Sequence, residues 1–247
     1  MKDFAYIDSL KNELDHYGPL PSAAVRNLKE VYRVEWTYNS NAIEGNTLSL
    51  IETKVVLEDG LTIGGKRLKE HLEVINHSAA IDFVENQVNH AGELDERTLK
   101  MIHYLILKNI DDENAGVYRS INVRISGSQH TPPHFLQVSQ EMNELFTWYE
   151  QEKESLHPVK LAALFHFKFV YIHPFADGNG RTARLLMNLI LMSHGFPPAI
   201  VKAEDSQRLH YYETLETASV QNNTESFIEL ISKCVEESLL NYLHVIK

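Results

Sequence analysis

The stretch HPFADGNGRTAR, residues 173–184, decides the fold because it places a glycine-rich turn between two apolar segments. Residues 159–172, just before it, are hydrophobic on nearly every side, which is typical of a helix at the centre of a protein. Pro174 ends that helix, since the residue before a proline is disfavoured in the helical region. A second helix is expected to begin near Arg181 and to end before Gly195. The stretch therefore predicts a turn between two core helices.

Capping signals and apolar periodicity predict that most of the remaining chain is helical. Ser49 and Glu52 have the spacing of a capping box, and Ser22 and Asp95 are expected N-caps. No repeat or flexible linker interrupts these helices, so residues 1–247 are expected to form a single all-α domain, a helical bundle around the central helix. The expected helices cover residues 22–41, 49–60, 68–88 (with Leu72, Ile75, Ala79 and Val84 on its apolar side), a segment from 95, a segment from 139, and residues 206–220 and 224–245.

Residues 116–138, called the flap below, break the helical pattern. They contain two glycines and an adjacent pair of prolines. Val123 and Ile125 alternate with Arg124 and Ser126, and such alternation is typical of extended backbone. The flap is therefore expected to form a short β-hairpin or an extended segment.

The composition is that of an ordinary globular chain, with 43% hydrophobic and 23% charged residues. A net charge of −11 without a basic block disfavours a nucleic-acid partner. No apolar run reaches the ~20 residues of a membrane span, and the first residues include acids where a signal peptide has an apolar core. The only cysteine, Cys234, allows no internal disulfide. We therefore expect a cytoplasmic protein that binds neither nucleic acid nor membrane.

Gly178, Asn179 and Gly180 form the turn and open the second helix. Glycine, and less readily asparagine, adopts the left-handed backbone that such a turn needs. The N–H groups of the turn and of the helix start can together hold a phosphate, although the triplet alone also fits an ordinary tight turn. Arg181 and Arg184 lie on one face near the start of the helix. Cations there oppose the helix dipole unless an anion binds between them, so they favour the phosphate site.

Asp177 and His173 supply two further groups that a phosphate site can use. A carboxylate beside a phosphate is a natural ligand for Mg²⁺, which bridges carboxylates and phosphate oxygens. By itself, Asp177 equally suits the cap of a turn. His173 ends the central helix beside the turn, and its ordinary pKa near 6.5 leaves a neutral base available at cellular pH. His166, within the same helix, and Phe175 are expected to be buried core residues.

Together these residues spell H-P-F-x-D-G-N-G-R-x-x-R, which is similar to the signature of the Fic family at every fixed position. The resemblance implies the Fic fold and the transfer of AMP from ATP to a Ser, Thr or Tyr hydroxyl, with release of pyrophosphate. It implies that His173 is the general base and that Asp177 holds Mg²⁺ or Mn²⁺. It assigns phosphate binding to Gly178, Asn179, Gly180 and Arg181, and the γ-phosphate to Arg184.

Residues 40–45, SNAIEG, resemble the inhibitory pattern of the same family, S/T-x-x-x-E-G/N. Because they precede the catalytic motif, the resemblance implies a class II Fic protein, with its inhibitory helix on the N-terminal side. Glu44 would pair with Arg184 and occupy the guanidinium that the γ-phosphate needs, and Ser40 would help to hold the helix. Without the catalytic motif, the same pattern would describe an ordinary helix end.

The flap also resembles a family feature, a β-hairpin beside the site that pairs with the backbone of the target protein. Pairing through the backbone would give register without demanding one target sequence. Tyr211 and Tyr212 lie where the family often has aromatics near the adenine, and a core role is equally open. Asn222 and Asn223 are shifted from the family's nucleotide-contacting asparagine, which leaves base specificity open. The residues that match the place of the hairpin are Asn122, Val123, Arg124, Ile125, Ser126 and Gly127.

Two other functions stay open at this stage. Glu44 could align a water that removes AMP from a target, which is de-AMPylation, or the site could sense ATP within a regulatory module. The presence of His173 disfavours the sensor, because binding alone needs no base. The intact G-N-G triplet disfavours phosphocholine or kinase-type transfer, since the kinase-like relative of the family departs from it. The target protein is not encoded, although self-modification is expected, and a homodimer is compatible with the family.

Overall fold

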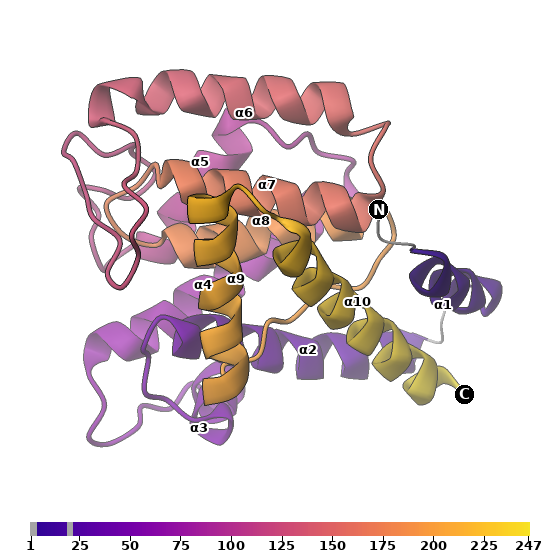
Figure 1. Cartoon of the computed structure of the whole chain (residues 1–247). Coiled ribbons are helices and arrows are strands. Elements are labelled where there is room, and N and C mark those ends of the chain that lie inside the picture. Colours follow the sequence, from indigo (N-terminus) through magenta and orange to yellow (C-terminus); the bar gives the residue numbers. More distant parts are fainter. Residues whose placement is uncertain (1–3, 19–21) are drawn as a thin grey trace.

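The computed structural model describes residues 4–18 and 22–247, which fold into helices joined by loops (Figure 1). No β-strand occurs within these ranges, and the predicted all-α class is confirmed. No helix in the described part of the chain is long and apolar enough to span a membrane. The α-helices are α1 (Ala5–His16), α2 (Ser22–Ile43), α3 (Leu50–Lys54), α4 (Leu68–Asn89), α5 (Glu96–Leu107), α6 (Val138–Glu152), α7 (Pro158–Ile172), α8 (Asn179–Ser193), α9 (Asp205–Gln221) and α10 (Glu225–Ile246); a π-helix, η1 (Val55–Asp59), and a 3₁₀-helix, η2 (Phe135–Gln137), complete the set.

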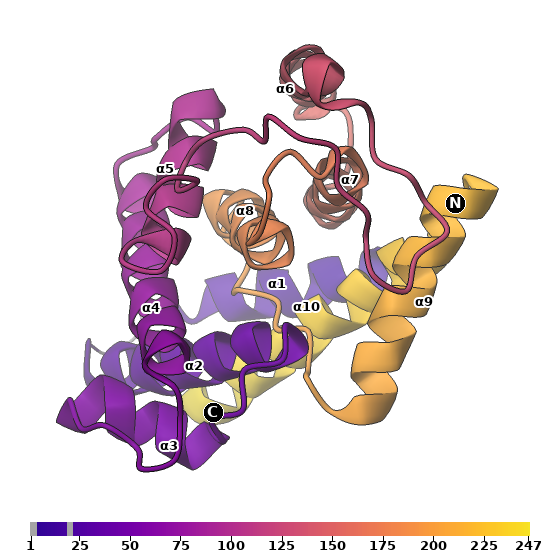
Figure 2. The same ribbon diagram turned by 90° about the vertical axis from the view of Figure 1, so that its left-hand side faces the viewer.

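Helices α7 and α8 form the centre of the molecule. Figure 2 shows them nearly end-on, with α4 and α5 along one side. The central position predicted for α7 is confirmed, but α8 is buried more completely: of its fifteen residues, only Gly180, Met192 and Ser193 are not buried. Apolar content does not predict this order, because α8 also buries the charged side chains of Arg181 and Arg184. Burying two guanidinium groups is costly unless they are paired, so their presence points to a use for them.

The helix boundaries follow the capping signals. The capping box of Ser49 and Glu52 is formed, with the backbone N–H of Glu52 3.2 Å from Ser49 Oγ. The Asp95 carboxylate caps α5 by accepting a hydrogen bond from the backbone N–H three residues later, at 2.7 Å. Ser22, the predicted N-cap of α2, is its first helical residue. Gly195 follows α8 with a φ of 77°, the left-handed conformation that glycine adopts without strain.

Two helices differ from the sequence prediction. Helix α1 is absent from that prediction, and its buried residues are Ile7 and Leu10. In α4, the spacing predicts Ile75 and Ala79 on the apolar side, but both are exposed. The buried side of α4 is instead partly polar, since Asn76 donates hydrogen bonds to two carbonyl oxygens at the end of α5, at 3.1 and 2.6 Å. Apolar spacing alone therefore does not identify the buried side of α4.

The flap takes the extended form rather than the hairpin (Figure 2). A β-ladder is replaced by bonds from side chains: Arg119 donates to a carbonyl in each arm, and Asn122 accepts from the backbone N–H of Phe135 at 3.0 Å. The two arms are therefore held together without strand pairing. At the tip, Gly127 has a φ of 80° within a turn closed by a hydrogen bond from Ser128 N–H to the Ile125 carbonyl.

Candidate active site

The turn between α7 and α8 is shaped by Asn179 and by two left-handed residues. His173 caps α7 with a φ of 51°, and Gly178 precedes α8 with a φ of 77°. The side chain of Asn179 bonds the backbone of Phe175 on both sides, accepting from its N–H at 3.0 Å and donating to its carbonyl at 2.9 Å. Phe175 is fully buried, as predicted. The amide of Asn179 therefore shapes the turn and leaves only its backbone N–H to bind an anion.

His103 on α5 supports the turn by contacting Asp177 and Phe175, a role that the sequence did not predict. Its Nε2–H donates to the carbonyl of Asp177 at 2.9 Å, and its Nδ1 accepts from the backbone N–H of Gly116 at 2.9 Å. Its ring is stacked on Phe175, with centroids 3.5 Å apart and planes at 3°. Because both ring nitrogens are used, one tautomer of a neutral imidazole is selected. In the sequence His103 is one polar residue within an amphipathic helix, and nothing there connects it to a site 74 residues later.

Arg184, Ser40 and Glu44 lie in contact, as the family resemblance implied. The buried guanidinium of Arg184 donates to Ser40 Oγ at 3.0 Å, to the Ser40 carbonyl at 2.8 Å and to Glu44 Oε1 at 2.7 Å. Glu44 lies just after α2, and its side chain is 35% exposed. A Cβ atom on Gly180 would collide with this carboxylate, so Glu44 lies directly against the start of α8. The position beside the helix N-terminus is therefore taken by a carboxylate of the same chain.

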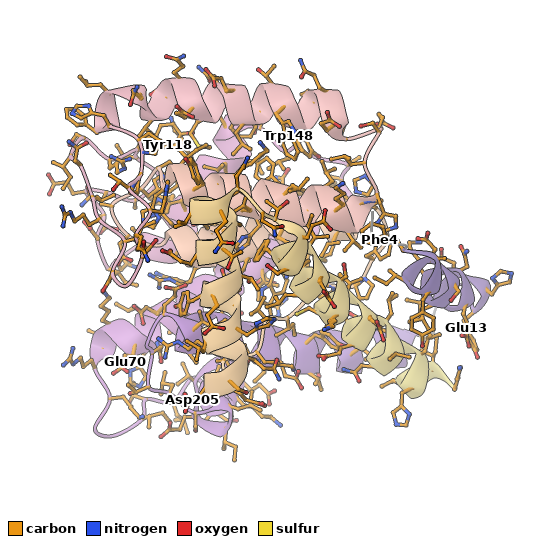
Figure 3. The ribbon with its side chains drawn as sticks, viewed as in Figure 1. Phe4, Glu13, Glu70, Tyr118, Trp148 and Asp205 are labelled. Atoms are coloured by element: carbon orange, nitrogen blue, oxygen red, sulfur yellow. The ribbon has the colours of Figure 1, made fainter. Side chains whose placement is uncertain are left out.

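The turn after Glu44 is tied to the start of α4. Glu70 accepts hydrogen bonds from the hydroxyl and the backbone N–H of Thr47, at 2.6 and 2.9 Å, and Figure 3 labels Glu70 at this end of α4. These bonds lower the pKa of Glu70 to about 2. Asn46 donates to Glu73 Oε2 at 2.8 Å in the same helix. The turn that follows Glu44 is thus anchored to α4 through Asn46 and Thr47.

Arg181 is a buried cation with unused hydrogen-bonding groups. Its Nε and Nη1 have no hydrogen-bond partner among the described residues. The nearest carboxylates, Glu73 and Asp177, lie 3.5 and 3.8 Å from its terminal nitrogens. An unsatisfied buried guanidinium is costly, and an anion bound at the start of α8 would satisfy it. Arg181 is therefore the strongest local indication of an anion site.

Asp177 is an exposed carboxylate that does not by itself form a metal site. Its side chain is 56% exposed, and its oxygens lie 3.9 Å from Lys69 and 3.8 Å from Arg181. Among the described residues, no group of three or more His, Cys, Asp or Glu side chains could hold a metal ion. A hard, exposed carboxylate beside an anion site fits Mg²⁺ if phosphate oxygens and water supply the other ligands.

His173 is neutral over the cellular pH range. Burial is the main cause and lowers its pKa to about 4, while the backbone of Val170 opposes this shift. The Nδ1 atom of His173 has no hydrogen-bond partner among the described residues. A neutral imidazole at the end of α7 therefore has a ring nitrogen that can take a proton.

Tyr211 and Tyr212 lie beside Arg184 and Ile43 and differ in their burial. Tyr211 is 1% exposed; its hydroxyl accepts from Arg184 at 3.3 Å and contacts His166 Nε2 at 3.0 Å. Its burial leaves no surface for an adenine ring. Tyr212 is half-exposed and donates to the carbonyl of Ile43 at 3.0 Å. Of the two, only Tyr212 has surface available for a nucleotide.

The outer flap residues follow the predicted alternation. Val123 and Ile125 are partly buried, whereas Arg124, Ser126 and Gly127 are exposed. The arm that follows the tip is fastened to α9, where Glu216 accepts hydrogen bonds from the Ser128 hydroxyl and the Gln129 backbone N–H at 2.5 and 2.7 Å. His130 stacks on Tyr171 at the end of α7. The flap is therefore fixed beside the same helix end that carries His173.

Stability should fall as the pH is lowered from 7 to 5. Burial lowers the pKa of His103 and of His173 to about 4, and lowers those of His77 and His166 well below their usual value. An unfolded histidine titrates near pH 6.5, so in this window the unfolded chain binds protons that the folded chain does not. Each depressed pKa thus stabilises the fold fully above about 6.5, and this contribution is lost toward 4.

The expected loss is about 2 kcal/mol each for His103 and His173. Free energies of unfolding in urea at pH 7 and pH 5 would measure it. The variant His103→Gln keeps an N–H donor but cannot be protonated in this range, so its stability should fall less. Equal free energies of unfolding at the two pH values would contradict the prediction.

The fold and the turn define a helical protein in which α8 begins at a glycine-containing turn, with a buried, incompletely paired arginine and with a histidine of lowered pKa at the end of α7. Residues 93–191 match the model of the Fic/DOC family. Fic-1 from C. elegans is 33% identical, with a TM-score of 0.88 over 98% of this chain and 71% of that one. A Fic domain containing signaling protein from Bacteroides thetaiotaomicron is 29% identical, with a TM-score of 0.88 over 97% of both chains. The chain belongs to the Fic/DOC family.

Curated relatives align with nearly the whole chain. "Protein adenylyltransferase Fic" of Nematostella vectensis is 38% identical over 98% of this chain and 56% of its own length. The protein of the same name from Aedes aegypti is 36% identical over 98% of this chain and 48% of its own. The chain thus spans about half the length of the curated relatives it matches.

Proposed function

We propose that the chain is a self-inhibited protein adenylyltransferase, which transfers AMP from ATP to a Ser, Thr or Tyr hydroxyl group of a protein. Relatives named for this activity align with nearly the whole chain. The observation that carries the proposal is the start of α8, where Arg181 lacks hydrogen-bond partners for Nε and Nη1 and Arg184 is held by Glu44. Such a site is completed by an anion, and a nucleotide phosphate fits its N–H groups and cations.

In the proposed reaction, the hydroxyl oxygen of the target attacks the α-phosphorus of ATP. A new P–O bond forms as the bond from the α-phosphorus to the bridging oxygen breaks, and pyrophosphate leaves. The neutral imidazole of His173 takes the hydroxyl proton. The remaining contribution of the protein is positioning and stabilisation of the charge that develops on the phosphates.

The phosphates would lie against the backbone N–H groups of residues 178–180. Arg181 would pair with them through its two unused nitrogens, and Arg184 would hold the γ-phosphate. Asp177 would hold Mg²⁺ or Mn²⁺, which when bound neutralises phosphate charge. Tyr212, with its exposed ring, is the remaining candidate for contact with the adenine.

Inhibition would arise from competition between two anions for one guanidinium. Glu44 pairs with Arg184 and lies against Gly180, where a phosphate would approach the helix. With Arg184 occupied, ATP would bind without its γ-phosphate anchored, in a pose unsuited to in-line attack. Ser40 would stabilise the inhibited state through its two contacts with Arg184.

The target would dock on the flap through backbone hydrogen bonds. Among the described residues, none of the backbone N–H groups of residues 122–127 donates an intramolecular hydrogen bond, so they are available to a partner strand. An exposed row of N–H groups suits the addition of an extended segment. Residues of this chain are proposed as one such target, through self-modification.

The donor and the transferred group can be identified together by mass spectrometry. The variant Glu44→Gly, incubated with ATP and Mg²⁺, should gain the mass of AMP on a Ser, Thr or Tyr residue. ATP labelled at the α-phosphate should transfer its label, whereas ATP labelled at the γ-phosphate should not. Transfer of the γ-label would show kinase chemistry and would overturn the proposal.

Asp177→Asn should raise the Mg²⁺ concentration needed for half-maximal transfer by about tenfold or more. The amide keeps the shape of the side chain but lacks the charge that a hard cation prefers. Transfer rates of the Glu44→Gly protein, with and without Asp177→Asn, would be measured across a Mg²⁺ titration. Asp82→Asn, which removes an exposed carboxylate from α4, is the matched control. An unchanged Mg²⁺ requirement in Asp177→Asn would remove Asp177 from the metal site.

De-AMPylation is a second candidate, favoured by the position of Glu44. One of its oxygens bonds Arg184, while the side chain remains 35% exposed beside the anion site, where it could align a water. Self-modified Glu44→Gly protein carrying labelled AMP would be incubated with the unmodified protein. Release of label that requires Glu44 would support this activity, and retention of label would argue against it.

The setting of the protein is proposed from bulk features. One hydrophobic cluster includes residues from Ile7 to Leu243, which supports a single domain over residues 1–247. The single cysteine suits the reducing cytoplasm, and the charge of −11 suits a protein without a nucleic-acid partner. A homodimer is compatible with this arrangement, and size measurement in solution would test it.

A further inference from the structure

Arg119 is a buried arginine within the flap, and its side chain bonds the end of α7 and both arms of the flap. It is 4% exposed. Its Nε donates to the carbonyl of His173 at 2.8 Å, Nη1 to the carbonyl of Ile121 at 2.9 Å, and Nη2 to the carbonyl of Pro133 at 2.6 Å. Its backbone N–H donates to the carbonyl of Pro174 at 2.9 Å. One residue therefore joins the end of α7 to the flap on each side of its tip.

The partners of Arg119 are unusual for a buried charge. No carboxylate in the described part of the chain forms an ion pair with it, and burial lowers its pKa. Three backbone carbonyls satisfy the guanidinium, in the fixed fork that a planar group provides. A buried cation paired only with neutral groups is an expensive way to hold a loop, since ladder hydrogen bonds would hold the arms without a charge. Its geometry therefore suggests a role beyond stability.

The bond to His173 falls where the backbone is strained. His173 has a φ of 51°, in the left-handed region that a non-glycine residue rarely occupies. Such a conformation persists only when surrounding contacts hold it, and strained residues of this kind gather at functional sites. The backbone N–H of His173 donates to the carbonyl of Phe169, and the carbonyl of His173 accepts a hydrogen bond from Arg119 Nε.

We infer that Arg119 is a positioning residue that sets the place of the His173 imidazole relative to both arms of the flap. A target segment paired with the flap would then present its hydroxyl at a fixed distance from the base. This inference rests on the proposed adenylyltransferase function. It adds that Arg119 links the flap, where the target docks, to His173, which takes the proton. A change at Arg119 would therefore misalign the base without altering the phosphate-binding groups.

Because the side chain of Arg119 donates only to His173 and the flap, its replacement should lower the turnover number and spare nucleotide affinity. Arg119→Lys keeps one positive charge and one donor group, but it cannot reach three carbonyls in a fixed fork. We expect it to lower the turnover number for self-modification by about tenfold or more, with the Kd for ATP within about twofold of the parent. Arg119→Met should lower turnover further.

The test uses the full chain with Glu44→Gly as the parent. Transfer of α-labelled AMP at saturating ATP gives the turnover number, calorimetry with a non-hydrolysable ATP analogue and Mg²⁺ gives the Kd, and thermal unfolding reports the fold. Deuterium exchange of residues 120–134 reports the flap. Arg33→Lys, on α2 away from the site, is the control for replacing an arginine with a lysine. Glu216→Gln, which weakens the fastening of the flap to α9, controls for a loosened flap with His173 left in place.

The inference would be supported if Arg119→Lys lowers the turnover number while its Kd and thermal unfolding, and the activity of Arg33→Lys, match the parent. The loss of activity in Glu216→Gln should then be at least about fivefold smaller than the loss in Arg119→Lys. Equal losses in Arg119→Lys and Glu216→Gln would overturn it, because loosening of the flap would then suffice. Parent-like turnover in Arg119→Lys, or an equal loss of turnover and ATP affinity, would also overturn it. If Arg119→Met does not fold, Arg119→Lys alone decides. A parent without AMP transfer would instead contradict the proposed function.

Discussion

Replacing Glu44 with glycine should raise the rate of AMP incorporation into the protein itself by about tenfold or more. The carboxylate of Glu44 holds Arg184 at 2.7 Å and lies against Gly180, so its removal frees both the guanidinium and the approach to the helix. Hydrogen bonds to charged groups contribute roughly 1.5–3 kcal/mol, and about 1.4 kcal/mol corresponds to a factor of ten. Because Glu44 is 35% exposed, solvent screening places the expected gain at the lower end of that range.

Transfer of α-labelled AMP, followed over time with ATP and Mg²⁺, would measure this gain. Glu44→Gln, which keeps the shape of the side chain without its charge, should give an intermediate rate. Glu35→Gln, on α2 and paired with Lys202 rather than with Arg184, should leave the rate unchanged. If Glu44→Gly and the unmodified protein incorporate AMP at the same rate, Glu44 does not inhibit transfer.

Removing the imidazole of His173 should lower the transfer rate by roughly 10²–10⁴-fold, the usual contribution of a positioned general base. The effect is expected in the Glu44→Gly background, where the starting rate is high enough to measure the loss. The pKa of His173 is about 4, so almost every molecule has the neutral base near pH 7. The N–H groups and arginines at the start of α8 are left in place, so His173→Ala should still bind ATP.

Two measurements on His173→Ala separate the possible roles. Label transfer measures the rate of the reaction, and the Kd for a non-hydrolysable ATP analogue measures nucleotide binding at the start of α8. His90→Ala, at the exposed end of α4, is a control for loss of an imidazole. Transfer retained in His173→Ala would remove His173 as the base. If both Glu44→Gly and the double variant Glu44→Gly/His173→Ala bind ATP but neither transfers AMP, the protein would be a nucleotide sensor rather than a transferase.

The parts of the site that are contiguous in the sequence were predictable, and the parts that bridge distant segments were not. Residues 173–184 carry their chemistry in one turn, and Ser40 and Glu44 are one helical turn apart, so spacing places them. The contact of Glu44 with Arg184 spans 140 residues, and it was predicted only from the family resemblance. His103 and Arg119 bond backbone carbonyls, and a backbone acceptor leaves no residue type in the sequence to match.

The fold shows the same division. Helix starts such as Ser49 and Asp95 depend on neighbouring residues and were predicted correctly. The buried side of α4 depends on Asn76 finding carbonyls at the end of α5, a tertiary contact that apolar spacing does not report. The flap has alternating residues typical of strands, but its arms are joined by the side chains of Arg119 and Asn122. The alternation of residues therefore predicted extended backbone in the flap but did not predict how its two arms are held together.

The bare Cα of Gly180 has a consequence for how this protein can change over generations. The carboxylate of Glu44 lies where a Cβ atom on residue 180 would stand, and the proposed phosphate would approach the same point. A side chain at 180 would push the Glu44 carboxylate aside and would also stand in the path of the proposed phosphate, so it would weaken the proposed inhibition and the proposed transfer in one step. In the proposed mechanism, loss of Ser40 or Glu44 would remove contacts with Arg184 and leave the backbone N–H groups at the start of α8 in place. Regulation is thus the more easily lost of the two properties.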